Sequence, residues 1–557
     1  MERAVARLME HGVYQDVRLV GRTGDGGADI LASLNNNRWV VQVKFRRSGV
    51  IGPEAVDEVL HSMDLYHADI PVIATNAVVN QDVIKMRNQL YAQRGINLQI
   101  WDRPVLLRLF ERLETSSKKI RDPRPYQEDA IEGIVGQYLA NQKKSGLVIL
   151  ATGLGKTFVA AEAIRRIREK VLNCKILVLA HTNELVYQLE KSFFPVLDKY
   201  TSTCVWNGFE VGDVYESEIT FACISSVAKF IGKNDFLPAN YNLIIIDEAH
   251  HAGSKTYREF IDYSNTGTRD GSFLLGLTAT PWRSDEHDLE SIFQQEICRV
   301  DIIEGMSKGY LANVDYRMHV DNINWKNLYK LKELTPRALN RTLFISEWDD
   351  AVIDKLQEAW AEIPNPRAIV FCSKIDHAFT MMDKINSRDF TKAGIIYSGT
   401  FHGKKMSAIE RSVTLSDFHD GRLGLMCAVD IFNEGIDVPD VNILVFQRVT
   451  HSRRIFVQQL GRGLRVSEGK DKVIVLDFVS DIRRFAAGIE MKSQLSRSSR
   501  YIQLGNPIKF MNKKGEDKEA EKFLKTWLDD VARIEEAGED DHVLKFPPDL
   551  RDFGLGT

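Results

Sequence analysis

Short, uninterrupted apolar runs recur through the middle of the chain and are separated by longer stretches of mixed polarity. They include residues 148–150, 176–179, 243–246, 368–371 and 443–446. Runs that are apolar at every position, rather than at alternate positions, are typical of strands buried on both faces of a parallel sheet. The pattern therefore predicts α/β domains with parallel sheets from about residue 122 onward.

The first 115 residues show a different pattern. Residues 2–11 have the spacing of a helix, and residues 39–45 alternate between apolar and polar side chains. Because side chains along a strand alternate between its faces, Gln42 and Lys44 are predicted to share one face, and Val41, Val43 and Phe45 the other. This segment therefore predicts a separate N-terminal α/β domain.

Composition sets broad limits. A chain of 557 residues predicts about three or four folding units, and 44% hydrophobic and 27% charged residues are ordinary for a globular protein. No apolar run reaches the roughly 18 residues that cross a bilayer, and no signal-peptide pattern follows Met1, so we expect a cytoplasmic protein without a membrane partner. The six cysteines are scattered singly, which predicts reduced core thiols. The net charge of −4 neither favours nor excludes binding to DNA.

A glycine-containing segment, residues 151–157, follows the apolar run 148–150 and precedes a predicted helix. Such a segment is a phosphate cradle, because glycines let backbone N–H groups approach the oxygens and a helix N-terminus attracts anions. Lys156 is expected to reach the β and γ phosphates of ATP, and the Thr157 hydroxyl to bind Mg²⁺. The match is partial, because Leu150 stands where the general motif has its first glycine. The candidate nucleotide-binding residues here are Thr152, Gly153, Gly155, Lys156 and Thr157.

An acidic pair, Asp247 and Glu248, follows the apolar run 243–246. Open α/β sheets bind their ligands at such strand ends. Asp247 is expected to hold Mg²⁺, and Glu248 to orient and deprotonate the water that attacks the γ-phosphate. The alternative is that the pair only caps a following helix, but the cradle upstream favours the catalytic interpretation.

Two arginines, Arg462 and Arg465, lie three positions apart on a predicted helix within residues 458–465. This spacing lets both guanidinium groups point the same way. Because transition-state charge on the γ-phosphate usually calls for an arginine, both are candidate catalytic residues. A merely basic helix face is the alternative, although it would not require the glycines of this segment.

Together these segments resemble the superfamily 2 helicases and translocases of the DEAH-lettered kind, over about two thirds of the chain. The resemblance implies two RecA-like domains, with ATP in the cleft between them and a nucleic-acid strand crossing both. It also implies that Gln127 reads adenine and that Gly435 and Asp437 contribute to the nucleotide site. The branch that these motifs resemble contains RadD-type helicases and the motor subunits of type I and type III restriction enzymes, which implies DNA as the partner. The further motifs are residues 124–127, 180–185, 277–281, 369–373 and 433–439.

The N-terminal domain carries candidate chemistry of its own. A glycine-dense turn brings Asp29 to the start of a strand, ahead of Gln42 and Lys44. A carboxylate and an amide oxygen can hold Mg²⁺ against a phosphodiester, and an ammonium group beside them can assist the attacking water. Taken alone, these residues are also explained by a solvated strand face.

Their surroundings resemble the Mrr-like branch of PD-(D/E)xK restriction nucleases, in which a glutamine replaces the second acid. The segments that carry this resemblance are residues 24–30, 40–44 and 70–76, and it covers about the first 110 residues. It implies a restriction-endonuclease-like fold, with Asp29 and Gln42 as metal ligands and Lys44 as a catalytic residue. It also implies that Glu2 is the glutamate of the first helix.

The predicted organisation is a nuclease domain (1–115), two RecA-like domains (122–303 and 367–485), an intervening lobe (304–366) and a mainly helical C-terminal tail (486–557). An apolar stripe at helical spacing in the tail predicts a helix docked on the motor core or, alternatively, a face for a protein partner. The stripe comprises Phe523, Leu524, Trp527, Leu528, Val531 and Ile534.

The function predicted from these features is an ATP- and Mg²⁺-dependent DNA helicase or translocase coupled to an endonuclease, of a restriction or anti-phage kind. Two alternatives stay open at this point. One is a repair or remodelling motor whose N-terminal domain holds DNA without cutting it. The other is a nucleic-acid-sensing ATPase that recruits a protein partner through the tail.

Overall fold

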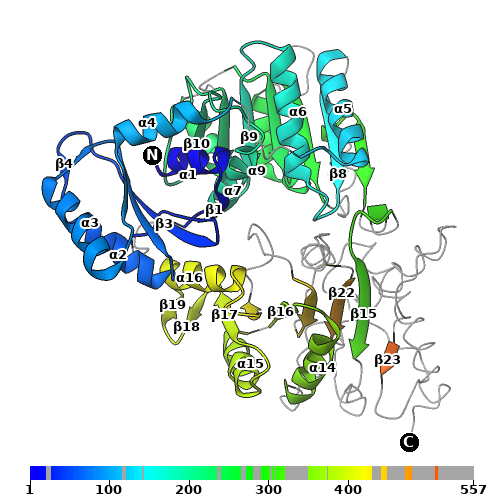
Figure 1. Cartoon of the computed structure of the whole chain (residues 1–557). Helices are drawn as coiled ribbons and strands as arrows, with labels where there is room; N and C mark the ends of the chain where they lie inside the picture. The colour runs from blue at the N-terminus through cyan, green and yellow to red at the C-terminus, as the bar shows by residue number, and fades with distance from the viewer. Residues whose placement is uncertain are drawn as a thin grey trace, which may run out of the picture.

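The part of the chain that the structure describes is a mixed α/β structure with three large sheets and helices on their faces (Figure 1). None of the helices within the described ranges is both long and apolar enough to span a membrane. The computed structural model describes residues 1–20, 27–115, 121–140, 144–234, 240–264, 271–279, 289, 291–301, 304–305, 308–319, 349–372, 374–429, 441–447, 470, 472–478 and 509–511.

The N-terminal domain is built on a five-stranded sheet of order β1-β2-β3-β5-β7, in which β1, β2 and β3 are antiparallel and β5 and β7 run parallel to β3. Helices α1 and α4 cover one face, and α2 and α3 the other. The strands are β1 Gln15–Leu19, β2 Ile30–Leu34, β3 Asn37–Lys44, β5 Ile70–Thr75 and β7 Gln99–Trp101, with a small pair β4 Val50–Ile51 and β6 Val78–Val79. The helices are α1 Glu2–His11, α2 Glu54–Leu65, α3 Gln81–Arg94 and α4 Arg103–Arg112.

The alternation predicted for residues 39–45 is confirmed as far as Lys44, where β3 ends; Phe45 lies beyond the strand and is exposed rather than packed with Val41 and Val43. Val41 and Val43 pack in the core that α1 completes, whereas Val40 packs in the core that α2 completes. Since β3 is continuous through Lys44, Gln42 and Lys44 lie on the same face as Val40, which is the face of α2.

The central domain contains seven parallel strands in the order β10-β11-β9-β12-β13-β8-β14. Its apolar runs are buried along their whole length, as predicted, with α5, α6 and α7 on one face and α8 and α9 on the other. The strands are β8 Ser145–Leu150, β9 Ile176–Ala180, β10 Thr203–Trp206, β11 Ile219–Cys223, β12 Leu243–Asp247, β13 Phe273–Thr278 and β14 Glu296–Val300. The helices are α5 Pro125–Ala140, α6 Lys156–Lys170, α7 Asn183–Phe193, α8 Ile224–Asn234, the 3₁₀ turn η1 Ala249–His251 and α9 Lys255–Tyr263.

The C-terminal domain repeats this plan with seven parallel strands in the order β17-β20-β16-β21-β22-β15-β23. The strands are β15 Asn313–His319, β16 Ala368–Phe371, β17 Ala393–Tyr397, β20 Leu425–Val429, β21 Ile443–Phe446, β22 Lys472–Asp477 and β23 Lys509–Met511, with a hairpin of β18 Thr400–Phe401 and β19 Lys404–Lys405. The helices are α14 Asp349–Glu362, α15 Ile375–Ser387 and α16 Ala408–His419.

This domain includes segments that the sequence placed elsewhere. β15 and α14 fall in the range predicted as an intervening lobe, 304–366, yet β15 pairs with β22 and α14 packs in the same core. β23 likewise adds a strand from the range predicted as a mainly helical tail. β15 was not recognisable because it lacks an apolar run: its Arg317 pairs with Asp315 at 2.6 Å and with Glu362 of α14 at 2.5 Å.

Candidate functional site

The loop between β8 and α6 forms the predicted cradle, residues 151–157. Gly153 and Gly155 have φ angles of +94° and +85°, which residues with side chains rarely adopt. A Cβ atom at Gly155 would also lie 2.7 Å from Nε2 of Gln127. Lys156 and Thr157 begin α6, where unpaired backbone N–H groups favour an anion, and Thr152 is half-buried beside them.

Gln127 braces this loop. Its Nε2 donates to the carbonyl of Leu154 at 2.7 Å, and its Oε1 accepts from the backbone N–H of Arg124 at 3.0 Å. The Tyr126 hydroxyl donates to the same Leu154 carbonyl at 3.0 Å. With both ends of its amide engaged and only 1% of its surface exposed, Gln127 holds the cradle in shape. Its contact with adenine stays a prediction.

Asp247 and Glu248 lie beside the cradle at the end of β12. Lys156 Nζ is 3.2 Å from Glu248 Oε1, so the predicted phosphate-binding and water-activating groups meet. The Oδ1 atom of Asp247 is buried and accepts no hydrogen bond from the described residues. Burial, and then the neighbouring Glu248 carboxylate, raises the pKa of Asp247 to about 6. A buried carboxylate oxygen of this kind fits the Mg²⁺ ion that accompanies ATP.

His250 joins the acidic pair to β13, and it is absent from the residues predicted from the sequence. Its Nδ1 atom lies 3.4 Å from Glu248 Oε2 and 3.3 Å from the Thr278 hydroxyl. Thr278 belongs to residues 277–281, one of the motifs that carry the resemblance to helicases. His250 therefore contacts both the acidic pair and this motif.

Four predicted motor residues lie outside the described part of the chain: Gly435, Asp437, Arg462 and Arg465. The apolar stripe of the tail lies outside it as well. Their roles stay predictions.

Asp29, Gln42 and Lys44, here called the N-terminal cluster, come together at one end of β3. Asp29 Oδ2 accepts a hydrogen bond from the backbone N–H of Val43 at 2.5 Å. Gln42 is 2% exposed, so the alternative of a solvated strand face does not hold for it. Its Oε1 atom accepts no hydrogen bond from the described residues. A buried amide oxygen without a donor, beside a carboxylate, fits a divalent cation.

Lys44 is held at the strand end by the neighbouring strand. The Thr75 hydroxyl donates to the Lys44 carbonyl at 2.7 Å. Two residues further on, the Asn76 side chain both donates to and accepts from the backbone of Arg46, at 2.7 and 2.9 Å. The segment 70–76 therefore positions Lys44.

Glu58 of α2 contacts two members of the N-terminal cluster, although it was not predicted from the sequence. Gln42 Nε2 donates to Glu58 Oε2 at 2.5 Å, and Lys44 Nζ forms an ion pair with the same oxygen. Partial burial opposes ionisation, but hydrogen bonds from Lys44 and Gln42 and the charges of Lys44 and Arg46 outweigh it and lower the pKa of Glu58.

Glu2 is not brought into this cluster. It lies exposed in the first turn of α1, and no hydrogen bond or ion pair among the described residues joins it to the cluster. Its neighbour Arg3 pairs at 2.8 Å with Glu190 of the central domain. The role of Glu2 stays a prediction.

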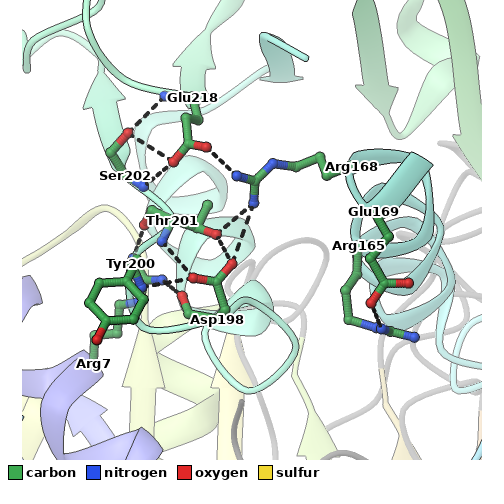
Figure 2. Close-up of polar contacts among 9 residues, drawn as sticks. All are labelled: Arg7, Arg165, Arg168, Glu169, Asp198, Tyr200, Thr201, Ser202 and Glu218. Atoms are coloured by element: carbon green, nitrogen blue, oxygen red, sulfur yellow. Dashed lines mark hydrogen bonds and ion pairs between the residues drawn. The ribbon is translucent and has the colours of Figure 1, made fainter. Parts of the chain in front are cut away.

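α1 also carries Arg7 into a loop of the central domain, residues 198–201. Arg7 donates to the carbonyls of Thr201 and Asp198 at 2.6 and 2.5 Å. On the other side of the loop, Arg168 of α6 donates to the Thr201 hydroxyl at 2.5 Å, as Figure 2 shows. Because α6 begins at the cradle, the loop that receives Arg7 is attached to the helix that carries Lys156.

A second contact joins the N-terminal sheet to the C-terminal domain at Asp420, directly after α16. Asp420 forms ion pairs with Arg18, at 3.1 Å, and with Arg38. Burial of Asp420 opposes ionisation, but a hydrogen bond from His419 and the charges of the two arginines outweigh it and lower the pKa of Asp420 to about 2. The N-terminal domain thus bridges the other two, with α1 beside α7 and α2 beside α16 (Figure 1).

Comparison with known families identifies the parts. Residues 1–110 match a restriction endonuclease model of the Mrr kind, residues 120–283 match the res subunit of type III restriction enzymes, and residues 351–467 match the helicase conserved C-terminal domain. The chain joins a restriction endonuclease domain to a helicase motor. Both resemblances inferred from the sequence are confirmed, and the two matches to helicase models fall in the central and C-terminal domains.

Individual relatives match about two thirds of the chain. The endonuclease subunit of the type I restriction enzyme EcoAI of Escherichia coli is 25% identical over 401 residues, 66% of this chain and 47% of that protein. IRC3 of Saccharomyces cerevisiae, provisionally named an ATP-dependent helicase, is 26% identical over 369 residues, 64% of this chain and 51% of that protein. The chain thus spans about half the length of these relatives.

A solved structure shares the fold. The ATP-dependent type ISP restriction-modification enzyme LlaBIII bound to DNA superposes with a TM-score of 0.51 at 17% identity, covering 86% of this chain and 36% of that one. At this identity the similarity shows the fold alone.

Proposed function

We propose that the protein is an ATP- and Mg²⁺-dependent DNA helicase or translocase coupled to an endonuclease, and that it acts in restriction-type defence against foreign DNA. The observation that carries the coupling is the bridge formed by the endonuclease domain. Arg7 reaches the loop tied to α6, while Arg18 and Arg38 reach the other motor domain at Asp420. DNA as the partner is supported by the type I restriction enzyme subunit among the relatives.

In the motor, the cradle binds the phosphates of ATP and Lys156 contacts the β and γ groups. Arrival of the phosphates draws Lys156 away from Glu248, whose carboxylate is then available to orient the attacking water and take its proton. Thr157 and Asp247 would hold Mg²⁺, which neutralises phosphate charge when bound.

In the endonuclease domain, Asp29 and Gln42 would hold a divalent cation against the scissile phosphate, and that cation polarises the phosphodiester when bound. Lys44 stabilises the charge that develops on the phosphate and orients the water. Strand pairing of β3 with β5 fixes the direction in which Lys44 extends.

This proposal is tested by incubating the purified full chain with plasmid, linear and forked DNA, each with Mg²⁺ or EDTA and with or without ATP. We expect cleavage that requires Mg²⁺ and responds to ATP, together with ATP hydrolysis that DNA stimulates. Intact DNA in every reaction, despite DNA-stimulated hydrolysis, would contradict the endonuclease part and favour a motor whose N-terminal domain only holds DNA.

Asp420→Ala is expected to uncouple the two activities. The change removes the ion pairs with Arg18 and Arg38, so movement of the C-terminal domain no longer acts on the endonuclease domain. DNA-stimulated ATP hydrolysis should stay within about twofold of the unmodified protein, while the effect of ATP on cleavage should fall by about tenfold, as expected for a coupling free energy of 1–3 kcal/mol.

Asp417→Ala is the matched control, because Asp417 pairs at 2.7 Å with Arg422 in its own domain. The measurement is the ratio of cleavage rates with and without ATP for each protein. A ratio unchanged by Asp420→Ala would show that this contact does not transmit the state of the motor.

Binding of Mg²⁺-ATP is expected to weaken below pH 6. Because the pKa of Asp247 is raised to about 6, the carboxyl is protonated below that pH and must lose a proton to bind the cation. Affinity should therefore be constant above about pH 7 and fall by up to about tenfold per pH unit below 6. The affinity is measured by titration with a fluorescent ATP analogue from pH 5 to 8, and a parallel titration in EDTA, which removes Mg²⁺, is the control. An equal pH dependence in EDTA would assign the effect to another group.

A further inference from the structure

We propose that Glu58 is a metal ligand of the endonuclease site and supplies, from α2, the second carboxylate that Gln42 lacks. This inference rests on the proposed endonuclease function and extends its ligand set beyond Asp29 and Gln42. The site would then present two carboxylates and one amide oxygen to a divalent cation, with Lys44 beside them.

The Glu58 carboxylate contacts two members of the N-terminal cluster directly. A single oxygen, Glu58 Oε2, accepts from Gln42 Nε2 at 2.5 Å and pairs with Lys44 Nζ. The other end of the Gln42 amide, Oε1, is buried and without a donor among the described residues. Glu58 therefore lies next to the amide whose buried oxygen, Gln42 Oε1, could be satisfied by a cation.

Charge supports the same assignment. Asp29 alone gives the N-terminal cluster one negative charge, whereas oxygen sites for Mg²⁺ and Ca²⁺ draw much of their affinity from the number of carboxylates. The Glu58 side chain is 44% exposed, while Gln42 is 2% exposed. The Glu58 carboxylate is therefore open to solvent, next to the buried amide of Gln42.

A purely structural role does not explain the position. α2 is already anchored by Ala55, Val56 and Val59, which are at most 1% exposed in the core of this domain. An exposed ion pair adds little to such packing. The Glu58 carboxylate contacts the two residues with predicted chemical roles, Gln42 and Lys44.

The test measures Mn²⁺ binding to the full chain without nucleotide, by the electron paramagnetic resonance signal of free Mn²⁺. All proteins carry Asp247→Asn, so that the motor site does not contribute. Glu58→Gln is expected to weaken Mn²⁺ binding by about tenfold or more, as Asp29→Asn does. Asp57→Asn, which removes the adjacent exposed carboxylate of the same helix, should leave binding within about twofold.

A charge-swap variant, Gln42→Glu with Glu58→Gln, restores two acids to the site and is expected to recover most of the lost Mn²⁺ affinity. Thermal unfolding of each variant establishes that the domain is folded.

Mn²⁺ affinity unchanged in Glu58→Gln, but reduced in Asp29→Asn, would overturn the role of Glu58 and leave the endonuclease proposal standing. Mn²⁺ affinity unchanged in both variants, together with DNA that stays intact in the unmodified protein, would overturn both. The two failures are therefore distinguishable.

Discussion

Glu248→Gln is expected to lower the rate of ATP hydrolysis by about 10²–10⁴-fold, the range typical of losing a general base, while ATP stays bound. The amide keeps the shape of the side chain but cannot take a proton from water. Glu248 also sits at φ +49°, an uncommon conformation for a residue with a side chain, which the surrounding fold must impose. That backbone is unchanged in the variant, so the direction of the side chain is preserved.

Steady-state hydrolysis at saturating DNA and binding of a fluorescent ATP analogue are the two measurements. Glu216→Gln, at an exposed position of the central domain, is the matched control and should change neither. A rate of ATP hydrolysis in Glu248→Gln within threefold of the unmodified protein would show that Glu248 is not the general base. Because Glu248 pairs with Lys156 at 3.2 Å, nucleotide affinity is expected to rise slightly when that competing charge is lost.

The plan of the motor was predictable because its signals are local. The strands β8, β9, β12, β16 and β21 contain continuous apolar runs, and the cradle lies between β8 and the helix α6 that follows it. Asp247 and Glu248 end another run, so their placement at the sheet edge follows from strand direction alone. β15 escaped prediction for the opposite reason, since polar residues that pair with one another interrupt its apolar pattern.

Glu58 is a site residue that the local sequence pattern indicates only weakly. Glu58 follows Ala55 by three positions and precedes Ser62 by four, and both of these residues are buried on one face of α2. An acidic residue at helical spacing with buried residues was therefore the one signal in the sequence that pointed to Glu58. This signal could not be interpreted without knowing that α2 packs on β3, the strand that carries Gln42 and Lys44. The register of β3 could be predicted from alternation, but the helix that faces it could not.

The bridge between domains was not predictable at all. Arg7 looks in sequence like one more charge on an amphipathic helix, yet it enters a loop about 190 residues away. Arg18 and Arg38 meet Asp420 across a still larger separation. Such surface charges find their partners only when the domains dock against each other. The sequence pattern within one domain does not show which residues of another domain it will contact.

Lys44→Ala is expected to reduce Mg²⁺-dependent DNA cleavage by about 10²–10³-fold or more, as removal of one preorganised donor to a developing charge typically does. DNA-stimulated ATP hydrolysis should be unchanged, because Lys44 contacts no residue of the motor among its described contacts. Loss of the Lys44–Glu58 ion pair should cost about 0–1 kcal/mol of stability, since both side chains are partly exposed.

Lys85→Ala is the matched control, because Lys85 is an exposed lysine of the same domain, 71% exposed and paired with Asp82. Cleavage on plasmid and linear DNA, measured beside ATP hydrolysis, separates the two centres: Lys44→Ala removes cutting alone, and Glu248→Gln removes hydrolysis and with it the effect of ATP on cutting. Cleavage that survives Lys44→Ala would mean that the metal and Asp29 suffice, or that the nuclease assignment is wrong. Asp29→Asn decides between these outcomes, because cutting that survives it as well cannot come from this site.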